Sequence, residues 1–192
     1  DAVEAMRTAT EEVAAAAAQR YALLVGVNQY ESPEVTPLRF SVADARAVHA
    51  LLTDPARGGF APENVVLLTD DQEDPKRKPT RKNIYDGLNW IQQNARPDDL
   101  VVVYYSGHGF REREKGTAYL LPADTRPNLL DRTAIANTDF MDLLARIPAG
   151  RKVVFLDACH SGGLSPGAKA EAKLPREYYD LLMRVEGTVT LA

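Results

Sequence analysis

The chain has 192 residues, a formal net charge of -4 and 45% hydrophobic residues, so one domain with a sizeable core is expected and intrinsic disorder is disfavoured. The mild acidity gives no electrostatic reason to expect nucleic acid or a membrane as partner. No apolar run has the length of a transmembrane helix and no secretory signal stands at the start. The single cysteine excludes an internal disulfide and a Cys-rich metal site, which favours a cytoplasmic protein.

The N-terminal residues 1–20 are rich in Ala and Glu and contain neither Gly nor Pro. They predict a helical extension or linker before a domain of residues 21–192. Within that domain, short apolar runs predict strands and helical spacing predicts helices. In chain order, the expected elements are a strand at 21–27, a helix at 40–52, a strand at 64–69, a helix at 80–94 capped by Thr80, strands at 100–105 and 119–121, a helix capped by Thr138 that ends near Arg146, a strand at 151–156 and the opening of another at 187–192.

Strands that alternate with helices of ten to fifteen residues predict an α/β fold, with a mostly parallel central sheet covered by helices on both faces. In such sheets the functional groups gather beyond the carboxyl ends of the strands. That rule selects two segments, residues 106–109 (SGHG) after the third long strand and residues 157–162 (DACHSG) after the fourth.

These two segments hold the residues of a thiol nucleophile and its base. Cysteine attacks as the thiolate, and a nearby imidazole both removes the proton and stabilises the anion. Cys159 is the only thiol, and His108 stands between Gly107 and Gly109. Glycines let a substrate main chain approach closely, and the amides of Gly109 and Cys159 are candidates for the oxyanion hole of an attacked carbonyl.

The motifs resemble those of the caspase clan, and they are closer to metacaspases and bacterial caspase homologues than to animal caspases. The resemblance rests on YYSGHG at 104–109, on DACHSG at 157–162, and on the separation of 51 positions from His108 to Cys159. VGVN at 25–28 and SVADA at 41–45 are also similar to that family, so the match covers about residues 21–163. The resemblance implies a caspase-like α/β/α sandwich and a cysteine endopeptidase that works through a thioester, without a metal or other cofactor in the chemical step.

The resemblance also implies a specificity pocket. In metacaspases the acidic residue two before the nucleophile, and another in the helix start, line the pocket for the residue that precedes the cleaved bond. Here these are Asp157 and Asp44. Paired carboxylates favour a cation and reject Asp. The expected partners are therefore protein or peptide substrates with Arg or Lys before the cleaved bond.

Two features of the family stay open in this sequence. The family fold continues with a further helix and strand, the small subunit, so residues 21–192 read as the large-subunit portion and a small-subunit segment of the same precursor is an expected partner. Basic residues within 169–184 are candidate self-cleavage sites. Many metacaspases need calcium, but no loop has EF-hand spacing, and Asp70, Asp71 and Asp74 are as easily a solvated turn.

Each candidate residue also has an ordinary structural interpretation. A lone cysteine such as Cys159 is usually a small core residue. The alternative for Asp44 is a carboxylate favoured by the helix dipole, and for Asp157 a buried carboxylate held by main-chain amides. Ser106 is either an ordinary serine in the turn at the end of the strand or a residue that adjusts the properties of the active site. His160 is read as structural, because adjacent residues of an extended segment point to opposite sides.

Two other functions compete with the peptidase. A catalytically silent caspase-fold interaction or regulatory module would keep the same motifs, and an electrophile carrying a peptidyl-arginine would then leave Cys159 unmodified. A nucleotide-binding α/β domain is the weaker alternative, because no strand is followed by G-x-G-x-x-G or by a Walker lysine.

Overall fold

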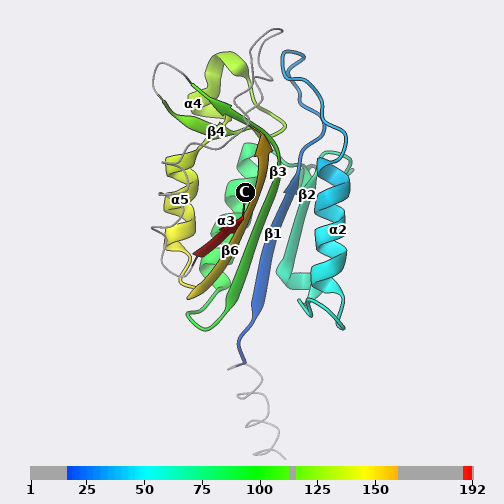
Figure 1. The fold of residues 1–192 in the computed structure, drawn as a ribbon, viewed down its shortest axis with the longest axis vertical. Coiled ribbons are helices and arrows are strands. Elements are labelled where there is room, and N and C mark those ends of the chain that lie inside the picture. Colours follow the sequence, from blue (N-terminus) through cyan, green and yellow to red (C-terminus); the bar gives the residue numbers. More distant parts are fainter. Residues whose placement is uncertain (1–16, 113–115, 160–187, 192) are drawn as a thin grey trace, which may run out of the picture.

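The computed structural model describes residues 17–112, 116–159 and 188–191. Its strands form one sheet (Figure 1). The strands are β1 (Arg20–Gly26), β2 (Val65–Thr69), β3 (Leu100–Arg111), β4 (Ala118–Leu120), β5 (Ile135–Ala136), β6 (Arg151–Cys159) and β7 (Thr188–Leu191). The helices are α2 (Ser41–Thr53), α3 (Arg81–Asn94), α4 (Leu130–Thr133) and α5 (Asn137–Arg146), with 3-10 turns η1 (Pro62–Asn64), η2 (Pro75–Arg77) and η3 (Pro127–Leu129).

The main part of the sheet is parallel. Its strand order is β2-β1-β3-β6-β7, and β4 and β5 extend the far end of β3 as antiparallel strands. All residues of β1 after Arg20 are buried, as expected for a central strand with a layer on each face. The predicted α/β architecture, with a mostly parallel sheet between helices, is confirmed.

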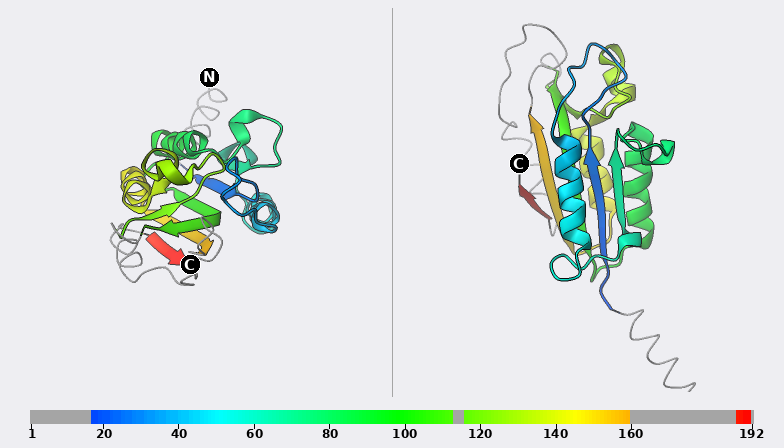
Figure 2. Two further views of the ribbon diagram at one scale, coloured as in Figure 1. Left: turned by 90° about the horizontal axis from the view of Figure 1, so that it is seen from above. Right: turned by 90° about the vertical axis from the view of Figure 1, so that its right-hand side faces the viewer.

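Helices cover both faces of the sheet (Figure 2). On one face Ala45 of α2 packs with Ala22, Leu24 and Tyr104 of the sheet. On the other face α3 and α5 supply the apolar side chains, including Ile84, Leu88, Ile91, Phe140 and Leu144, that pack on β1, β3 and β6. Side chains of β3 therefore alternate between two separate cores.

The helix starts were predicted with mixed success. Thr80 caps α3, since its hydroxyl accepts from the amide of Asn83 at 3.3 Å. The predicted cap at Thr138 is wrong, because α5 already begins at Asn137 and its N-cap residue is Ala136, which has no capping side chain. The start of α5 is set by β5, which ends at the preceding residue, and not by a local cap.

Strands β3 and β6 run beyond their predicted ends, so that residues 106–109 lie within β3 and residues 157–159 lie within β6 rather than after it. β3 continues from the predicted end at Tyr105 to Arg111, and β6 continues to Cys159. Beyond Ser106, β3 keeps its pairing with β6 and gains β4 as a new neighbour. This pairing keeps the glycine-rich stretch in an extended conformation, although its local sequence predicts a loop.

Several expectations fall outside the described residues. These are residues 1–16 of the helical extension or linker expected at 1–20, the position of His160 and the self-cleavage segment at 169–184. The described end of that extension, residues 17–20, is not helical, and β1 begins at Arg20. The strand expected at 187–192 is present as β7, which pairs with β6. In the part of the chain that the structure describes, no helix combines the length and hydropathy needed to cross a membrane.

Candidate active site

The two predicted catalytic residues are register partners on neighbouring strands. β3 and β6 pair in parallel from Leu100 opposite Arg151 to His108 opposite Cys159. The main chain thus brings an imidazole position and a thiol position side by side across one pair of strands. The side chain of Cys159 lies outside the described part, so the site is described here from the His108 side.

The His108 ring is buried, and its orientation is fixed by a main-chain carbonyl. Only 5% of the residue is exposed, and Nε2 lies 2.7 Å from the carbonyl oxygen of Thr36. A carbonyl only accepts, so Nε2 carries the proton and, in the neutral ring, Nδ1 carries the lone pair. Burial lowers the pKa of His108 below its ordinary 6.5, and the bond to Thr36 partly opposes that shift. The neutral ring is the form that can accept a proton.

The main chain around His108 is also held on one edge of β3. Its amide donates to the Tyr30 hydroxyl at 2.8 Å, and its carbonyl accepts from the amide of Leu121 at 3.0 Å. Peptide groups of an extended strand alternate between its two edges. The amide of the next residue, Gly109, therefore faces the opposite edge, on which β6 lies.

Tyr105 secures this arrangement from the other face of the strand. Its buried hydroxyl donates to the carbonyls of His108 (3.0 Å) and Leu121 (2.8 Å) and accepts from the Leu121 amide (3.1 Å). A methyl group at Gly107 would come within 2.7 Å of that hydroxyl. Gly107 is therefore required by the close approach of Tyr105.

We expect Tyr105→Phe to lower the free energy of unfolding by about 1–3 kcal/mol, because it removes the hydroxyl that donates to the buried Leu121 carbonyl. The matched control is Tyr21→Phe in the same sheet, whose hydroxyl makes one long bond of 3.4 Å to Asn94. Urea unfolding curves of the two variants give the comparison. An equal, small effect of both would show that the Tyr105 hydroxyl contributes little.

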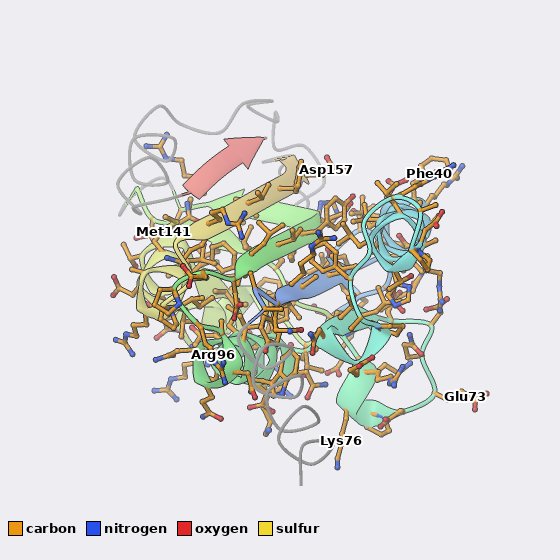
Figure 3. All side chains as sticks on the ribbon, turned by 90° about the horizontal axis from the view of Figure 1, so that it is seen from below. Phe40, Glu73, Lys76, Arg96, Met141 and Asp157 are labelled. Carbon is orange, nitrogen blue, oxygen red and sulfur yellow. The ribbon has the colours of Figure 1, made fainter. Side chains whose placement is uncertain are left out.

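The two carboxylates predicted for the specificity pocket both influence the pKa of one residue, Tyr104. Burial raises the pKa of Tyr104, a hydrogen bond with Ser106 lowers it, and the charges of Asp157 and Asp44 each raise it. Asp157 accepts from the Ser106 hydroxyl at 3.2 Å and is exposed at the end of β6 (Figure 3). Asp44 is exposed in the first turn of α2. The alternative of Asp157 as a buried carboxylate is wrong, since the residue is exposed.

No sequence pattern indicated the groups that hold the His108 ring. They lie on residues 27–40, the loop between β1 and α2. Thr36 contributes a main-chain carbonyl, which any residue type provides, and Tyr30 contributes a hydroxyl and a ring 5.3 Å from the His108 ring centroid. Only a three-dimensional structure reveals contacts of this kind, which span 72 to 78 residues.

The loop itself is anchored at its base. The Asp70 carboxylate accepts from the amides of Asn28 at 3.1 Å and Gln29 at 2.7 Å, and the carbonyl of Asn28 accepts from Leu38 at 2.7 Å. The Asn28 side chain accepts from the Val42 amide at the start of α2 at 3.4 Å. Asn28 thereby joins the end of β1, the loop and α2.

The acidic residues after β2 have local partners in the described structure. Asp70 holds the loop, Asp71 accepts from Thr69 and Arg46, and Asp74 accepts from the Lys76 amide at the start of η2. Across 17–112, 116–159 and 188–191, no group of three or more His, Cys, Asp or Glu side chains is arranged to hold a metal ion. The expectation of calcium activation therefore has no assigned site.

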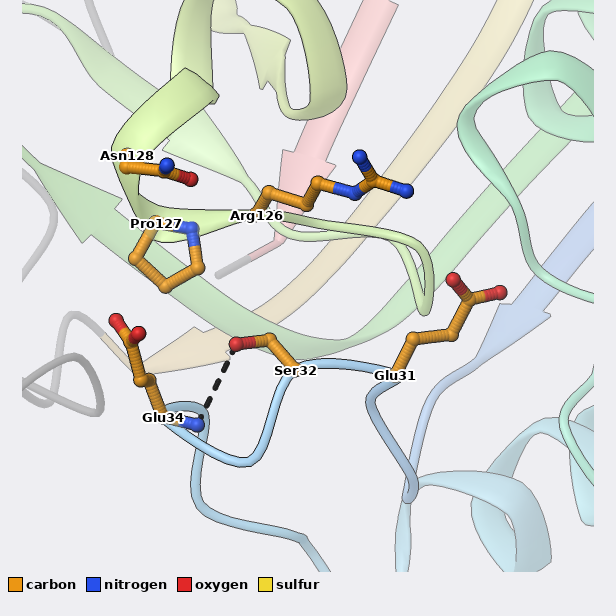
Figure 4. Close-up of a pocket in the computed structure, with 6 residues that line it drawn as sticks. All are labelled: Glu31, Ser32, Glu34, Arg126, Pro127 and Asn128. Atoms are coloured by element: carbon orange, nitrogen blue, oxygen red, sulfur yellow. Dashed lines mark hydrogen bonds between the residues drawn. The ribbon is translucent and has the colours of Figure 1, made fainter.

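A hollow of about 370 Å³ lies beside the loop that holds His108 (Figure 4). Glu31, Ser32 and Glu34 line it from the loop, and the opposite wall is formed by residues 126–128. The carboxylates of Glu31 and Glu34 and the guanidinium of Arg126 all line this hollow, so its charge favours neither an anionic nor a cationic ligand. We assign it no ligand.

Comparison with known proteins places the chain in a family. The family model described as "Metacaspase, peptidase C14 domain" matches residues 20–166, which include both strands of the site. The chain belongs to the metacaspase family. The predicted recognition is therefore confirmed, and so is the caspase-like nature of the fold.

Individual relatives agree with this assignment. Metacaspase-1 of Eremothecium gossypii is 36% identical over 152 residues, which are 74% of this chain and 32% of that protein. Metacaspase-7 of Arabidopsis thaliana is 35% identical over 159 residues, 78% of this chain and 36% of that protein. A solved structure of a Geobacter sulfurreducens protein has a TM-score of 0.57 at 23% identity, covering 75% of this chain and 51% of that one, and supports the fold. The chain spans about a third of the length of these metacaspases.

Proposed function

We propose that the protein is a cysteine endopeptidase that hydrolyses peptide bonds after Arg or Lys, with Cys159 as nucleophile and His108 as general base. The observation that carries the proposal is the pairing of these two positions on β3 and β6, with the His108 ring fixed through Nε2. Membership of the metacaspase family supports the same chemistry.

In the proposed reaction, Nδ1 of His108 takes the thiol proton of Cys159, and the thiolate sulfur attacks the carbonyl carbon of the scissile bond. The C–N bond then breaks, the leaving amine takes the proton from the imidazolium, and a thioester remains. Water, deprotonated by His108, attacks the thioester and releases the acid and the thiol. The amide of Gly109, which faces the β6 edge, and that of Cys159 are the proposed donors to the oxyanion.

The proposed specificity follows from charge. The charges of Asp157 and Asp44 both raise the pKa of Tyr104, which lies on the face of the sheet that carries α2. A guanidinium or ammonium would be attracted there and a carboxylate repelled. The proposed substrates are then proteins with exposed Arg or Lys. A small-subunit segment of the same precursor is the proposed partner that completes the catalytic domain. The proposed chemical step uses no metal. Calcium would act as an activator only.

The competing proposal, a silent interaction module, predicts no reaction at Cys159. Purified full-length protein is treated with a peptidyl-arginine acyloxymethyl ketone, with and without calcium, and the adduct is located by mass spectrometry. We expect the peptidyl-arginine reagent to alkylate Cys159 and the corresponding peptidyl-aspartate reagent to leave it unmodified. Absence of an adduct under both conditions would favour the silent module.

The pH dependence of the same labelling reports on His108. Because burial lowers its pKa below 6.5, more than half of the His108 rings are neutral at pH 6.5, and the protonated form predominates only in more acidic solution. The labelling rate at pH 6.5 is therefore expected to keep more than half of its value at higher pH and to fall further in more acidic solution. A rate that is already half lost above pH 6.5 would contradict a buried, neutral His108 as the base.

A further inference from the structure

Tyr30, in the loop between β1 and α2, contacts His108 in two separate ways. Its hydroxyl accepts a hydrogen bond from the His108 amide at 2.8 Å. Its ring lies against the imidazole, with 5.3 Å between the ring centroids and an angle of 33° between the ring planes. At this separation and tilt the rings are stacked, and not edge to face. One side chain therefore contacts both the main chain and the side chain of the proposed base.

The Tyr30 hydroxyl is engaged within the protein. Besides its bond to the His108 amide, it forms a hydrogen bond with the hydroxyl of Tyr105. Burial raises the pKa of Tyr30 far above its ordinary value, and the charge of Asp70 raises it further. The hydroxyl therefore stays protonated throughout the pH range in which a cysteine peptidase would work, so it does not serve as an acid or base of the reaction. Its role is that of a neutral, fixed hydrogen-bonding group.

The loop fixes Tyr30 from both sides along the chain. Asn28 and Gln29, directly before it, donate their amides to the Asp70 carboxylate. The amide of Glu31, directly after it, donates to a main-chain carbonyl of the segment that follows β4, at 2.8 Å. The ring itself packs against the apolar cluster that contains the buried Val35. Tyr30 is therefore held by its neighbours before any substrate is present.

A fixed aromatic ring beside the imidazole matters for the charge that the proposed reaction creates. When His108 takes the thiol proton, the ring becomes a cation in a site where the residue is only 5% exposed. A cation within about 6 Å of the centroid of an aromatic ring is attracted by the ring face, more strongly where water is excluded. The Thr36 carbonyl meets the same imidazole at Nε2, and the Cys159 position lies opposite on β6.

We propose that Tyr30 is a positioning residue of the peptidase: its hydroxyl fixes the main chain of His108, and its ring holds the imidazole and stabilises the cation that forms there. Through the His108 amide, the hydroxyl also sets the position of the next amide, that of Gly109, which is the proposed oxyanion donor on the opposite edge of β3. This inference rests on the proposed function, because the cation forms only if His108 accepts the thiol proton.

The first experiment isolates the hydroxyl. Tyr30→Phe keeps the ring and removes the acceptor for the His108 amide. We expect kcat on an arginine amide reporter to fall by about threefold to thirtyfold and KM to change by less than about twofold, because the base is displaced and the substrate pocket is not. Tyr85→Phe is the matched control, since this half-buried tyrosine of α3 also packs on the core and accepts a hydrogen bond, from Arg81 at 3.3 Å. Its kcat should be unchanged.

The second experiment isolates the electrostatic effect of the ring. Tyr30→pentafluorophenylalanine has nearly the shape of Tyr30→Phe, but fluorination reverses the charge distribution of the ring face. The ionisation of His108 is followed by NMR of isotope-labelled histidine in full-length protein that also carries Cys159→Ala, with His49 as internal reference. Relative to Tyr30→Phe, we expect the fluorinated ring to lower the pKa of His108, so that its acid dissociation constant rises by about twofold to tenfold. A ring that only fills space would leave this constant unchanged.

Failure of this inference and failure of the proposed function give different results. The NMR measurement uses protein without the nucleophile, so it reports on Tyr30 whether or not the parent protein hydrolyses peptides. An unchanged dissociation constant with the fluorinated ring would overturn the role of the ring. Equal losses of kcat in Tyr30→Phe and Tyr85→Phe, or a rise in KM alone in Tyr30→Phe, would overturn the role of the hydroxyl. A shifted constant in a protein that neither cleaves the reporter nor is alkylated at Cys159 would refute the peptidase and, with it, the task assigned to Tyr30, but not the contact.

Discussion

Replacement of Cys159 by Ala is expected to remove peptide-bond hydrolysis, with a loss in kcat of about 10⁴- to 10⁶-fold for residues that act as one catalytic unit. His108→Ala is expected to fall in the same range, because the thiol then lacks the imidazole that takes its proton. The double variant should be no worse than either single variant, since nucleophile and base act together. Initial rates on an arginine amide reporter, with burst kinetics, give these values.

His49→Ala is the matched control for that series. It removes another partly buried imidazole, on α2, that has no proposed role in the chemistry. Its kcat should stay close to that of the unmodified protein. Full activity of His108→Ala in folded protein would overturn the assignment of the base. Independent, multiplicative effects of the two catalytic replacements would show that they do not act as a pair.

The second large effect is expected at the specificity pocket. Asp157→Asn keeps the size of the side chain and an acceptor for the Ser106 hydroxyl but removes the charge that attracts Arg or Lys. Loss of one partner of a desolvated charge pair costs about 2–5 kcal/mol, which corresponds to a drop in kcat/KM of roughly 30- to 5,000-fold. Asp44→Asn should act in the same direction.

The selectivity of that effect is the decisive readout. Asp86→Asn is the control, since this exposed carboxylate lies on α3, across the sheet, and pairs there with Lys82. It should leave kcat/KM unchanged. Labelling of Cys159 by a small uncharged alkylating agent should also be unchanged in Asp157→Asn, because that reagent does not use the pocket. A variant without either carboxylate that still prefers Arg and Lys would place the specificity elsewhere.

The order and type of the main elements were predictable because their causes are local. A parallel strand buried on both faces reads as a continuous apolar run, as in β1 and the first half of β3. The cap at Thr80 is a contact within three residues. The motifs around His108 and Cys159 carry residue types with distinctive chemistry, so the sequence also indicated the family, which the comparisons confirm.

The prediction failed where the cause lies across the sheet. The far half of β3 and the end of β6 become strands because they pair with each other and with β4. The start of α5 likewise differs from the local cap signal at Thr138. A glycine-rich stretch has little intrinsic preference for a strand, so no window of neighbouring residues contains that information.

The sequence by itself determined the layered α/β fold, the family and the identity of the chemically capable residues, since these depend on local pattern and residue type. Only the tertiary structure decided the pairing of His108 with Cys159, the effect of Asp44 and Asp157 on the pKa of Tyr104, and the carbonyl of Thr36 that fixes the imidazole. The physical reason is that strand register and main-chain acceptors come from contacts between distant segments, and a carbonyl oxygen is the same in every residue.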